Sequence, residues 1–224
     1  MTDKHILVTG GTGYVGGRLT PRLLNAGYKV RAMARSPERL LCRPWGRHPK
    51  MDVVPGDALD QSAFIHAAKG CDAAYYLIHS MNAAKGKFAQ ADRTAAQNMV
   101  TAAQQNNLTR IIYLGGLGEA DHESLSKHLK SRHEVEKILM SASVPVTNLR
   151  AAMILGAGSA SFEMLRYLVD RLPAMITPRW VQTPCQPISI RNVLDYLEGV
   201  LQAPETVGQT LDIGGTEVLA YRDL

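Results

Sequence analysis

Cysteine is scarce in this sequence of 224 residues, which contains only Cys42, Cys71 and Cys185. The number is odd, the positions are far apart, and no C-x-x-C pair or metal-ligand spacing occurs. This pattern excludes a disulfide framework and favours a reducing compartment, which we expect to be the cytoplasm. The seven histidines show no H-x-x-x-H or H-E-x-x-H arrangement, so the sequence predicts no metal site.

Long apolar runs are also missing, and none approaches the ~18 residues that a membrane span needs. The N-terminal residues lead directly into a strand-like stretch, without the apolar segment of a signal peptide. The 25 basic and 20 acidic side chains are scattered, and the densest basic stretch, residues 31–50, has few aromatic residues. We therefore expect a soluble protein with no membrane span and no nucleic-acid partner.

Short, almost continuously apolar runs alternate with helix-length segments. The runs favour strands buried on both faces of a sheet and cover residues 5–9, 29–34, 51–54, 73–78, 110–114 and 146–149. Helical patterns lie between them at residues 15–26, 62–68, 88–106 and 125–141. Such alternation is typical of βαβ units, so the sequence predicts an α/β fold with a Rossmann-type doubly wound parallel sheet.

The alternation weakens after residue 149. A helical pattern at residues 161–172 is followed by a proline-rich stretch, a second helical pattern at residues 192–201 and a last strand at residues 209–213. We expect residues 1–150 to form the Rossmann core and residues 151–224 to form a small C-terminal substrate-side lobe that returns to the sheet. The chain ends where a helix is expected to begin, so we expect further chain after residue 224.

The strongest chemical signal follows the first predicted strand, where Gly10-Gly11-Thr12-Gly13-Tyr14-Val15-Gly16 leads into a helix. Gly10 permits a tight turn, Gly13 lets the backbone approach a pyrophosphate, and Gly16 allows close packing of helix and strand. The free N–H groups at the helix N-terminus then face the phosphates. Because strand, glycines and helix occur in one βαβ unit, the segment predicts a dinucleotide site and not a plain turn.

An acidic residue is missing at the end of the second predicted strand, where Asp or Glu binds the ribose 2′-hydroxyl of NAD. The first acid, Glu38, lies beyond that strand. Arg35 at the strand end, together with Ser36 and with Arg31 as a further candidate, is suited to hold a 2′-phosphate by charge-assisted hydrogen bonds. Most arginines are solvated surface charges, but this position favours NADP(H), bound by the core of residues 1–150.

Three segments resemble the atypical and extended short-chain dehydrogenase/reductases, in particular the NmrA-like group. The segment of residues 9–16 matches the T-G-x-x-G-x-x-G loop of that family, and residues 56–60 match its G-D-x-x-D segment. Residues 77–80, Leu-Ile-His-Ser, occupy the place of the turn after its fourth strand. The resemblance implies that the coenzyme is contacted by residues of all three segments and by Arg132: Gly10, Thr12, Gly13, Tyr14, Val15, Gly16, Asp57, Ala58, Ile78, His79 and Ser80.

The catalytic triad of this family, Ser and Tyr-x-x-x-Lys, is absent. Glycines at residues 115, 116 and 118 stand where the serine is expected, and the best register of the following helix places His128 at the tyrosine and Arg132 at the lysine. Histidine can act as an acid because its usual pKa lies near neutrality. Arginine stays protonated, so Arg132 is suited to bind the ribose or amide and not to exchange a proton. The alternative interpretation is a solvated polar helix face.

Two functional hypotheses follow. The first is an NADP(H)-dependent oxidoreductase with a non-standard acid that acts on an unknown small-molecule substrate. The second is a catalytically silent NADP(H)-binding sensor or assembly protein, which would have a protein partner or form a homodimer. Measurement of turnover separates the two, because the fold does not determine the function.

Overall fold

The structure is a computed structural model that describes residues 4–79, 88–118, 126–171, 182–220 and 223. Seven strands form one sheet with the order β10-β6-β5-β4-β1-β2-β3, in which every neighbouring pair is parallel. Their bounds are β1 His5–Thr9, β2 Lys29–Ala34, β3 Met51–Pro55, β4 Ala73–Tyr76, β5 Arg110–Gly116, β6 Val146–Ala151 and β10 Thr210–Ile213. This order confirms the predicted doubly wound α/β fold.

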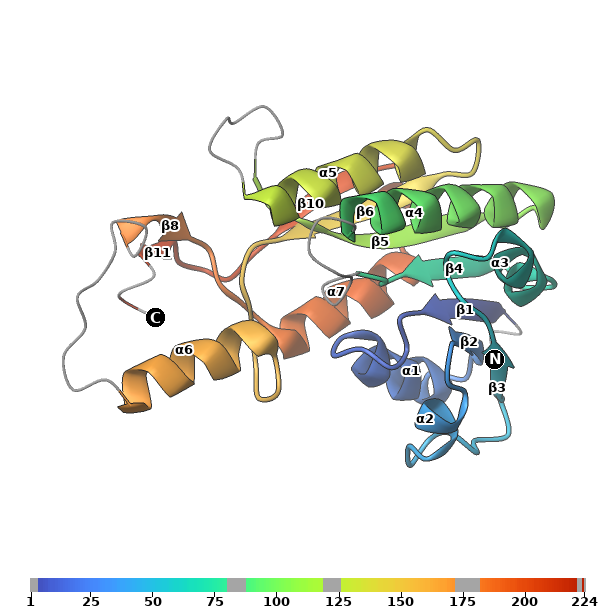
Figure 1. Ribbon diagram of the computed structural model, residues 1–224, viewed down its shortest axis with the longest axis horizontal. Helices are drawn as coiled ribbons and strands as arrows, with labels where there is room; N and C mark the ends of the chain where they lie inside the picture. Colours follow the sequence, from blue (N-terminus) through green and yellow to red (C-terminus); the bar gives the residue numbers. More distant parts are fainter. Residues whose placement is uncertain (1–3, 80–87, 119–125, 172–181, 221–222, 224) are drawn as a thin grey trace.

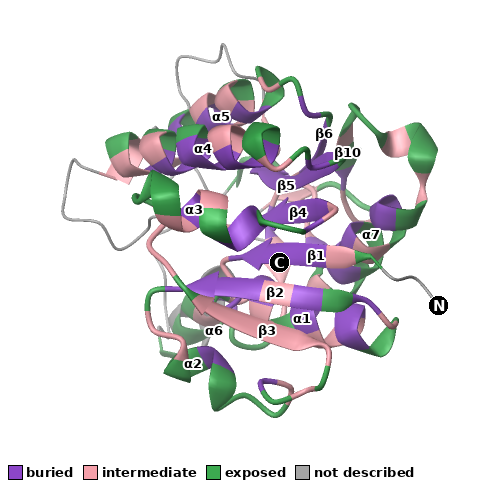
Figure 2. Cartoon of the chain, turned by 90° about the vertical axis from the view of Figure 1, so that its right-hand side faces the viewer, coloured by how far each residue is buried: buried purple, intermediate pink, exposed green. Residues whose placement is uncertain are grey.

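Successive residues of the central strands are buried on opposite faces of the sheet. Ile6 and Val8 of β1 belong to one apolar cluster, whereas Leu7 between them belongs to the other. Tyr75 and Tyr76 of β4 separate in the same way. Figure 2 shows the result, a band of buried strands under helices whose outer surfaces are exposed. Strands covered on both faces need apolar residues at every position, which explains the continuous runs in the sequence.

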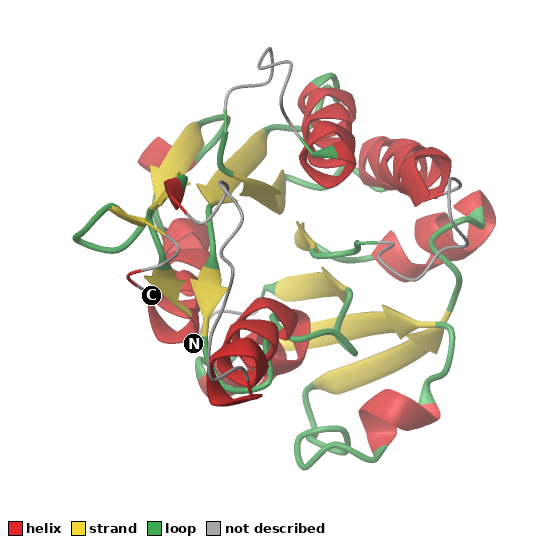
Figure 3. Ribbon diagram, turned by 60° about the vertical axis from the view of Figure 1, so that its left-hand side comes forward, coloured by secondary structure: helices red, strands yellow, loops and turns green. Residues whose placement is uncertain are grey.

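Helices cover both faces of the sheet (Figures 1 and 3). One face is covered by α3 Gln61–Ala68, α4 Phe88–Gln105 and α5 Lys127–Met140, which supply residues to the cluster that contains Leu7. The other face is covered by α1 Gly16–Asn25, α7 Ile190–Gln202 and the short α2 Glu38–Leu41. The sequence patterns predicted all of these helices except α2.

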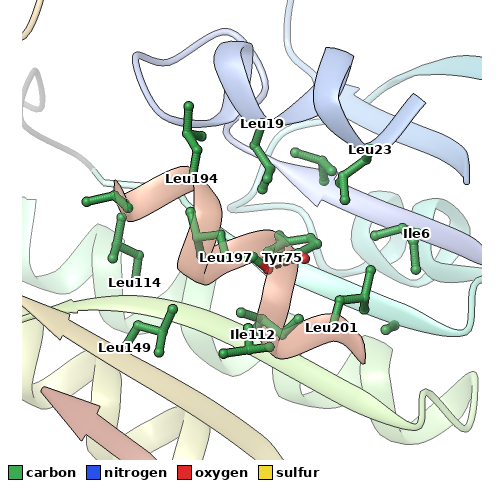
Figure 4. Close-up of a cluster of buried hydrophobic side chains, with 14 of the residues drawn as sticks. Ile6, Leu19, Leu23, Tyr75, Ile112, Leu114, Leu149, Leu194, Leu197 and Leu201 are labelled. Atoms are coloured by element: carbon green, nitrogen blue, oxygen red, sulfur yellow. Dashed lines mark hydrogen bonds between the residues drawn. The ribbon is translucent and has the colours of Figure 1, made fainter. Parts of the chain in front are cut away.

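Leucines of α1 and α7 interdigitate over the sheet (Figure 4). Leu19 and Leu23 of α1 and Leu197 of α7 are fully buried, and they pack with Ile112 of β5 in one cluster. The hydroxyl of Tyr75 donates a hydrogen bond to the carbonyl oxygen of Leu197 at 2.6 Å, so this large side chain is buried with its polar atom satisfied. A helix from the C-terminal part of the chain is thereby fixed to the N-terminal βαβ unit.

The chain after residue 151 both rejoins the sheet and extends beyond its edge. Strand β10 pairs with β6, while α6 Ala160–Arg171 projects away from the sheet in Figure 1. Two short strand pairs also belong to this part of the chain: β7 Ile154–Leu155 with β9 Ile188–Ser189, and β8 Pro184–Cys185 with β11 Leu219–Ala220. A 3-10 helix, η2 Pro204–Thr206, joins α7 to β10. Within the described ranges, no helix combines the length and apolar character that crossing a bilayer requires.

Two glycines in helices predict opposite responses to the same substitution. A Cβ on Gly16 would overlap the carbonyl oxygen of Gly10, whereas a Cβ on Gly199 of α7 meets nothing within 4 Å. We expect Gly16→Ala to lower the free energy of unfolding by roughly 3 kcal/mol through overpacking. We expect Gly199→Ala to raise it by about 0.5–1 kcal/mol, because alanine loses less entropy in a helix. Urea unfolding of both variants checks this, and equal effects would contradict it.

Candidate cofactor site

A cleft of about 710 Å³ opens at the carboxyl ends of the strands. It lies where the strand order reverses, because β1 leads to β2 and β3 on one side while β4, β5 and β6 follow on the other. Ligands of open α/β sheets bind at such switch points. The cleft brings together most of the residues selected from the sequence: Gly10, Thr12, Gly13, Tyr14, Val15, Gly16, Arg35, Asp57, Ala58, Ile78, His79 and Arg132.

The glycine corner between β1 and α1 forms the floor of the cleft. The amide of Gly13 donates a hydrogen bond to the carbonyl of Gly10 at 2.9 Å, which closes the turn. Gly10 has a positive φ of 75°, and a Cβ there would lie 2.5 Å from the carbonyl oxygen of Leu77 after β4. Only glycine therefore allows β1, α1 and the segment after β4 to approach this closely. The corner leaves room for a pyrophosphate at the N-terminus of α1, where the positive end of the helix dipole favours an anion.

A second pocket adjoins the cleft at the end of β2. Its lining consists of Thr12, Ala34, Arg35, Ser36 and Arg39. The two arginines are exposed, and they place two guanidinium groups on one small cavity. Ser36 lies here and not in the main cleft. Arg39, on α2, was missed by the sequence analysis, although its position four residues after Arg35 was the available signal.

Arg31, which the sequence offered as a further phosphate ligand, is used elsewhere. Its Nε lies 2.6 Å from Oδ2 of Asp52, and its Nη1 donates to the carbonyl oxygens of Ala67 and Lys69. The prediction for Arg31 was therefore wrong. The reason is its position along the strand: Arg31 lies within β2, where its register partner on β3 is Asp52, whereas Arg35 follows the carboxyl end of β2.

The G-D-x-x-D segment lines the outer part of the cleft. Oδ1 of Asp57 accepts a hydrogen bond from the amide of Leu59 at 3.0 Å, so this carboxylate also stabilises its own turn. The side chain of Asn98 on α4 donates to the carbonyl of Ala58 at 2.9 Å and fixes the segment to the helix layer. Asp60 caps α3, where hydrogen bonds from Ser62 and then Ala63 lower the pKa of its carboxyl group.

The inner end of the cleft is formed by β5 and α5. The guanidinium of Arg132 donates from Nη2 to the carbonyl of Leu114 at 2.5 Å, and among the described residues its buried Nε has no hydrogen-bond partner. A Cβ on Gly116 would lie 2.9 Å from Leu129 and 3.3 Å from Arg132. Glycine at position 116 therefore admits α5 close to the end of β5. The unpaired Nε fits a polar group of a bound coenzyme.

Two histidines meet beside this end of the cleft. Nε2 of His79, after β4, lies 3.0 Å from Nδ1 of His128 on α5. Nδ1 of His79 lies 3.6 Å from Oδ2 of Asp92, which is buried on α4. Burial, then the proximity of His79 and Arg132, lowers the pKa of His128 to about 4. His79 lines the cleft, His128 lies behind it, and Ser80 lies outside the described residues.

A parallel sheet that opens onto such a corner at its switch point makes this chain a Rossmann domain of the dinucleotide-binding class. Residues 10–165 match a family described as NAD(P)H-binding, and the chain belongs to that family. The resemblance to atypical short-chain dehydrogenase/reductases is thereby confirmed.

Sequence relatives match parts of the chain. The 3 beta-hydroxysteroid dehydrogenase/Delta 5-->4-isomerase of Mycobacterium tuberculosis is 31% identical over 118 residues, 49% of this chain and 30% of the relative. The (4-alkanoyl-5-oxo-2,5-dihydrofuran-3-yl)methyl phosphate reductase of Streptomyces griseus is 43% identical over 74 residues, 33% of this chain and 24% of the relative. This chain therefore covers less than a third of the length of either relative.

Solved structures match almost the whole chain. The Bordetella bronchiseptica enzyme WbmG in complex with NAD has a TM-score of 0.79 at 16% identity, covering 99% of this chain and 76% of that chain. The epimerase Mth375 of Methanothermobacter thermautotrophicus has a TM-score of 0.78 at 18% identity, covering 99% and 74%. At these identities the likeness shows the fold alone.

The low pKa of His128 predicts a pH-dependent stability. Between pH 6.5 and about 4 the unfolded chain binds a proton at this side chain that the folded chain does not, so acidification over this range lowers the free energy of unfolding. Over this range we expect the free energy of unfolding of His128→Asn to fall by roughly 1–2 kcal/mol less than that of the wild type. This value includes a reduction for solvent screening. Met140→Leu, an exposed and non-titrating change on α5, is the control. Parallel pH dependences of His128→Asn and wild type would contradict the prediction.

Proposed function

We propose that this protein is an NADP(H)-dependent oxidoreductase that acts on a small organic carbonyl or enone substrate. The observation that carries the proposal is the second pocket, where Arg35 and Arg39 converge beside the glycine corner. Phosphate oxygens accept charge-assisted hydrogen bonds from guanidinium groups. An NAD site would place a carboxylate at this strand end, and here the strand ends without one.

The residues divide into four groups along the cleft. The corner of residues 10–16 holds the pyrophosphate, Arg35, Ser36, Arg39 and Thr12 hold the 2′-phosphate, and Asp57 and Ala58 lie by the adenine. Arg132 binds the ribose or amide at the inner end, near Leu114 and His79. When bound there, the reduced coenzyme supplies a hydride for an electrophilic carbon of the substrate.

Residues 151–224 form the substrate-side lobe in this proposal. Ile154 of β7 lines the cleft, and α6 projects on the same side of the molecule as β8 and β11 (Figure 1). The redox reaction is supported by the names of relatives, among them the 2-alkyl-3-oxoalkanoate reductase of Stenotrophomonas maltophilia, which is 29% identical over 120 residues. The absence of the serine and tyrosine leaves a silent coenzyme-binding sensor as the alternative.

The second pocket predicts a coenzyme preference that depends on two arginines. Arg35→Ala and Arg39→Ala should each raise the Kd for NADPH by about 10- to 100-fold, because each removes a charged hydrogen-bond donor from the 2′-phosphate. The Kd for NADH should change less than about twofold, since NADH has no such phosphate. Titration of nicotinamide fluorescence measures both constants.

Arg43→Ala is the matched control for this experiment. Arg43 follows α2, is exposed, and lies outside both cavities, yet its removal changes the net charge by the same amount. A general electrostatic effect would weaken NADPH binding equally in all three variants and would contradict a specific phosphate site. Equal losses for NADH and NADPH in Arg35→Ala would also contradict it.

Turnover separates the oxidoreductase from the sensor. We expect the purified protein to consume NADPH in the presence of at least one member of a panel of ketones, aldehydes and enones. The loss of absorbance at the nicotinamide band measures this consumption. Tight NADPH binding with no consumption across the panel would favour the sensor. Failure to bind either coenzyme would overturn the proposed function.

A further inference from the structure

Residues 156–158 lie between β7 and α6, and their backbone packs against the side chain of Tyr14 in the glycine corner. A Cβ on Gly156 would overlap the hydroxyl oxygen of Tyr14 and would lie 2.6 Å from Ile190 of α7. This hydroxyl is buried and, among the described residues, has no hydrogen-bond partner. Close packing, which the glycine at position 156 permits, therefore holds the ring of Tyr14 against this part of the chain.

Arg18, in the first turn of α1, binds Tyr14 to the same residues. Its guanidinium lies over the ring of Tyr14, with Cζ 4.0 Å from the ring centroid. Its Nη1 donates a hydrogen bond to the carbonyl of Tyr14 at 3.2 Å, and its Nη2 donates to the carbonyl of Ala157 at 2.9 Å. Arg18 and Ala157 are 139 residues apart in the sequence. We call Tyr14, Arg18 and residues 156–158 the clasp.

The first turn of α6 is continuous with the clasp. The amide of Gly158 donates a hydrogen bond to Oε1 of Glu163 at 2.8 Å. The amide of Ser159 donates to the carbonyl of Gly156 at 3.0 Å, and the amide of Glu163 donates to the carbonyl of Ser159 at 2.9 Å. Residues 156–163 therefore form one hydrogen-bonded unit, and a movement of the clasp moves the start of α6 with it.

The clasp also borders the coenzyme cleft. Tyr14 lines the cleft, and so does Ile154, two residues before Gly156. The backbone of Tyr14 belongs to the corner at the N-terminus of α1, which is suited to a pyrophosphate. Separation of residues 156–158 from the core must either break the contacts of Arg18 or pull Tyr14 out of the corner. A dinucleotide that rests on the corner opposes the second movement.

We propose that the clasp couples the dinucleotide site to residues 154–163, because a bound coenzyme holds these residues in place through Tyr14 and Arg18. Arg18 is a positioning residue, since it lies outside both cavities and acts through Tyr14. The coupling itself requires only dinucleotide binding, the property of the family to which the chain belongs. Its use in catalysis rests on the proposed function: the coenzyme sets the substrate-side lobe and therefore binds before the substrate.

The coupling has a thermodynamic signature that simple packing lacks. If residues 156–158 open only after the coenzyme leaves, the population of the open state falls by the factor 1 + [L]/Kd, where [L] is the free coenzyme concentration. At a coenzyme concentration of about 100 Kd the limiting factor is about 100. Incomplete coupling gives a smaller factor, and coupling between two sites is typically about 5- to 150-fold. If the clasp only packs the chain, the open state is equally populated with and without coenzyme.

Hydrogen–deuterium exchange of the full chain tests the proposal without a substrate. With NADPH at about 100 Kd, the amides of Gly158, Ser159 and Glu163 should exchange at least about fivefold more slowly than without coenzyme. In Arg18→Ala these amides should exchange faster without coenzyme, and NADPH should slow their exchange by less than about twofold. Equal slowing in Arg18→Ala and the wild type would overturn the proposal, because the coenzyme would then act on these residues directly.

Arg22→Ala is the matched control. Arg22 lies one turn after Arg18 on α1, and its removal changes the net charge by the same amount. It forms ion pairs with Asp195 and Glu198 of α7 and so joins the same helix to a different element. NADPH should slow the exchange of the three amides in Arg22→Ala as much as in the wild type. Loss of the effect in both variants would overturn the proposal, since general loosening of α1 would explain it.

The outcomes separate the clasp from the proposed function. NADPH binding by the wild type without slower exchange of the three amides would overturn the clasp and leave the oxidoreductase in place. Slower exchange without turnover on any member of the substrate panel would overturn the oxidoreductase and support the clasp. If NADH binds more tightly than NADPH, it replaces NADPH in the exchange experiment. Failure of both coenzymes to bind would overturn the clasp together with the proposed function.

Discussion

The close approach of three backbone segments at the glycine corner is the constraint on which the rest of the structure depends. The end of β1, the start of α1 and the segment after β4 are in near contact, and a single Cβ on Gly10 would lie 2.5 Å from the carbonyl oxygen of Leu77. This contact exists because β1 and β4 are neighbours in the sheet although they are far apart in the chain. The same adjacency creates the crevice at the switch point. Fold and site therefore share one structural cause.

Apolar packing on both faces holds that corner in place. The helices α1 and α7 bury leucines against one face, and α3, α4 and α5 cover the other. Arg110, at the amino end of β5, adds hydrogen bonds on the side of the sheet opposite the cleft. Its guanidinium donates to the hydroxyl groups of Thr147 and Thr206 and to the carbonyl of Val200. The strands are therefore packed on both faces, and the cleft residues follow their carboxyl ends.

Residues at the inner end of the cleft contact one another across three elements. Gly116 lets α5 approach β5, and the guanidinium of Arg132 donates a hydrogen bond to the carbonyl of Leu114. His128, one turn before Arg132 on α5, lies 3.0 Å from His79, which follows β4. These contacts join α5 to the carboxyl ends of two neighbouring strands.

The sequence by itself determined the sheet, most of its helices and the glycine corner, because apolar periodicity and the glycine spacing are local signals that survive in almost any context. It also located Arg35 through the missing acid. Only the tertiary structure decided that Arg31 is paired with Asp52, that Arg39 joins the second pocket, and that Asp92 stands behind His79. These facts depend on which strands and helices are neighbours, and a side chain's partner across a sheet or between helices is set by that packing and leaves no pattern in the local sequence.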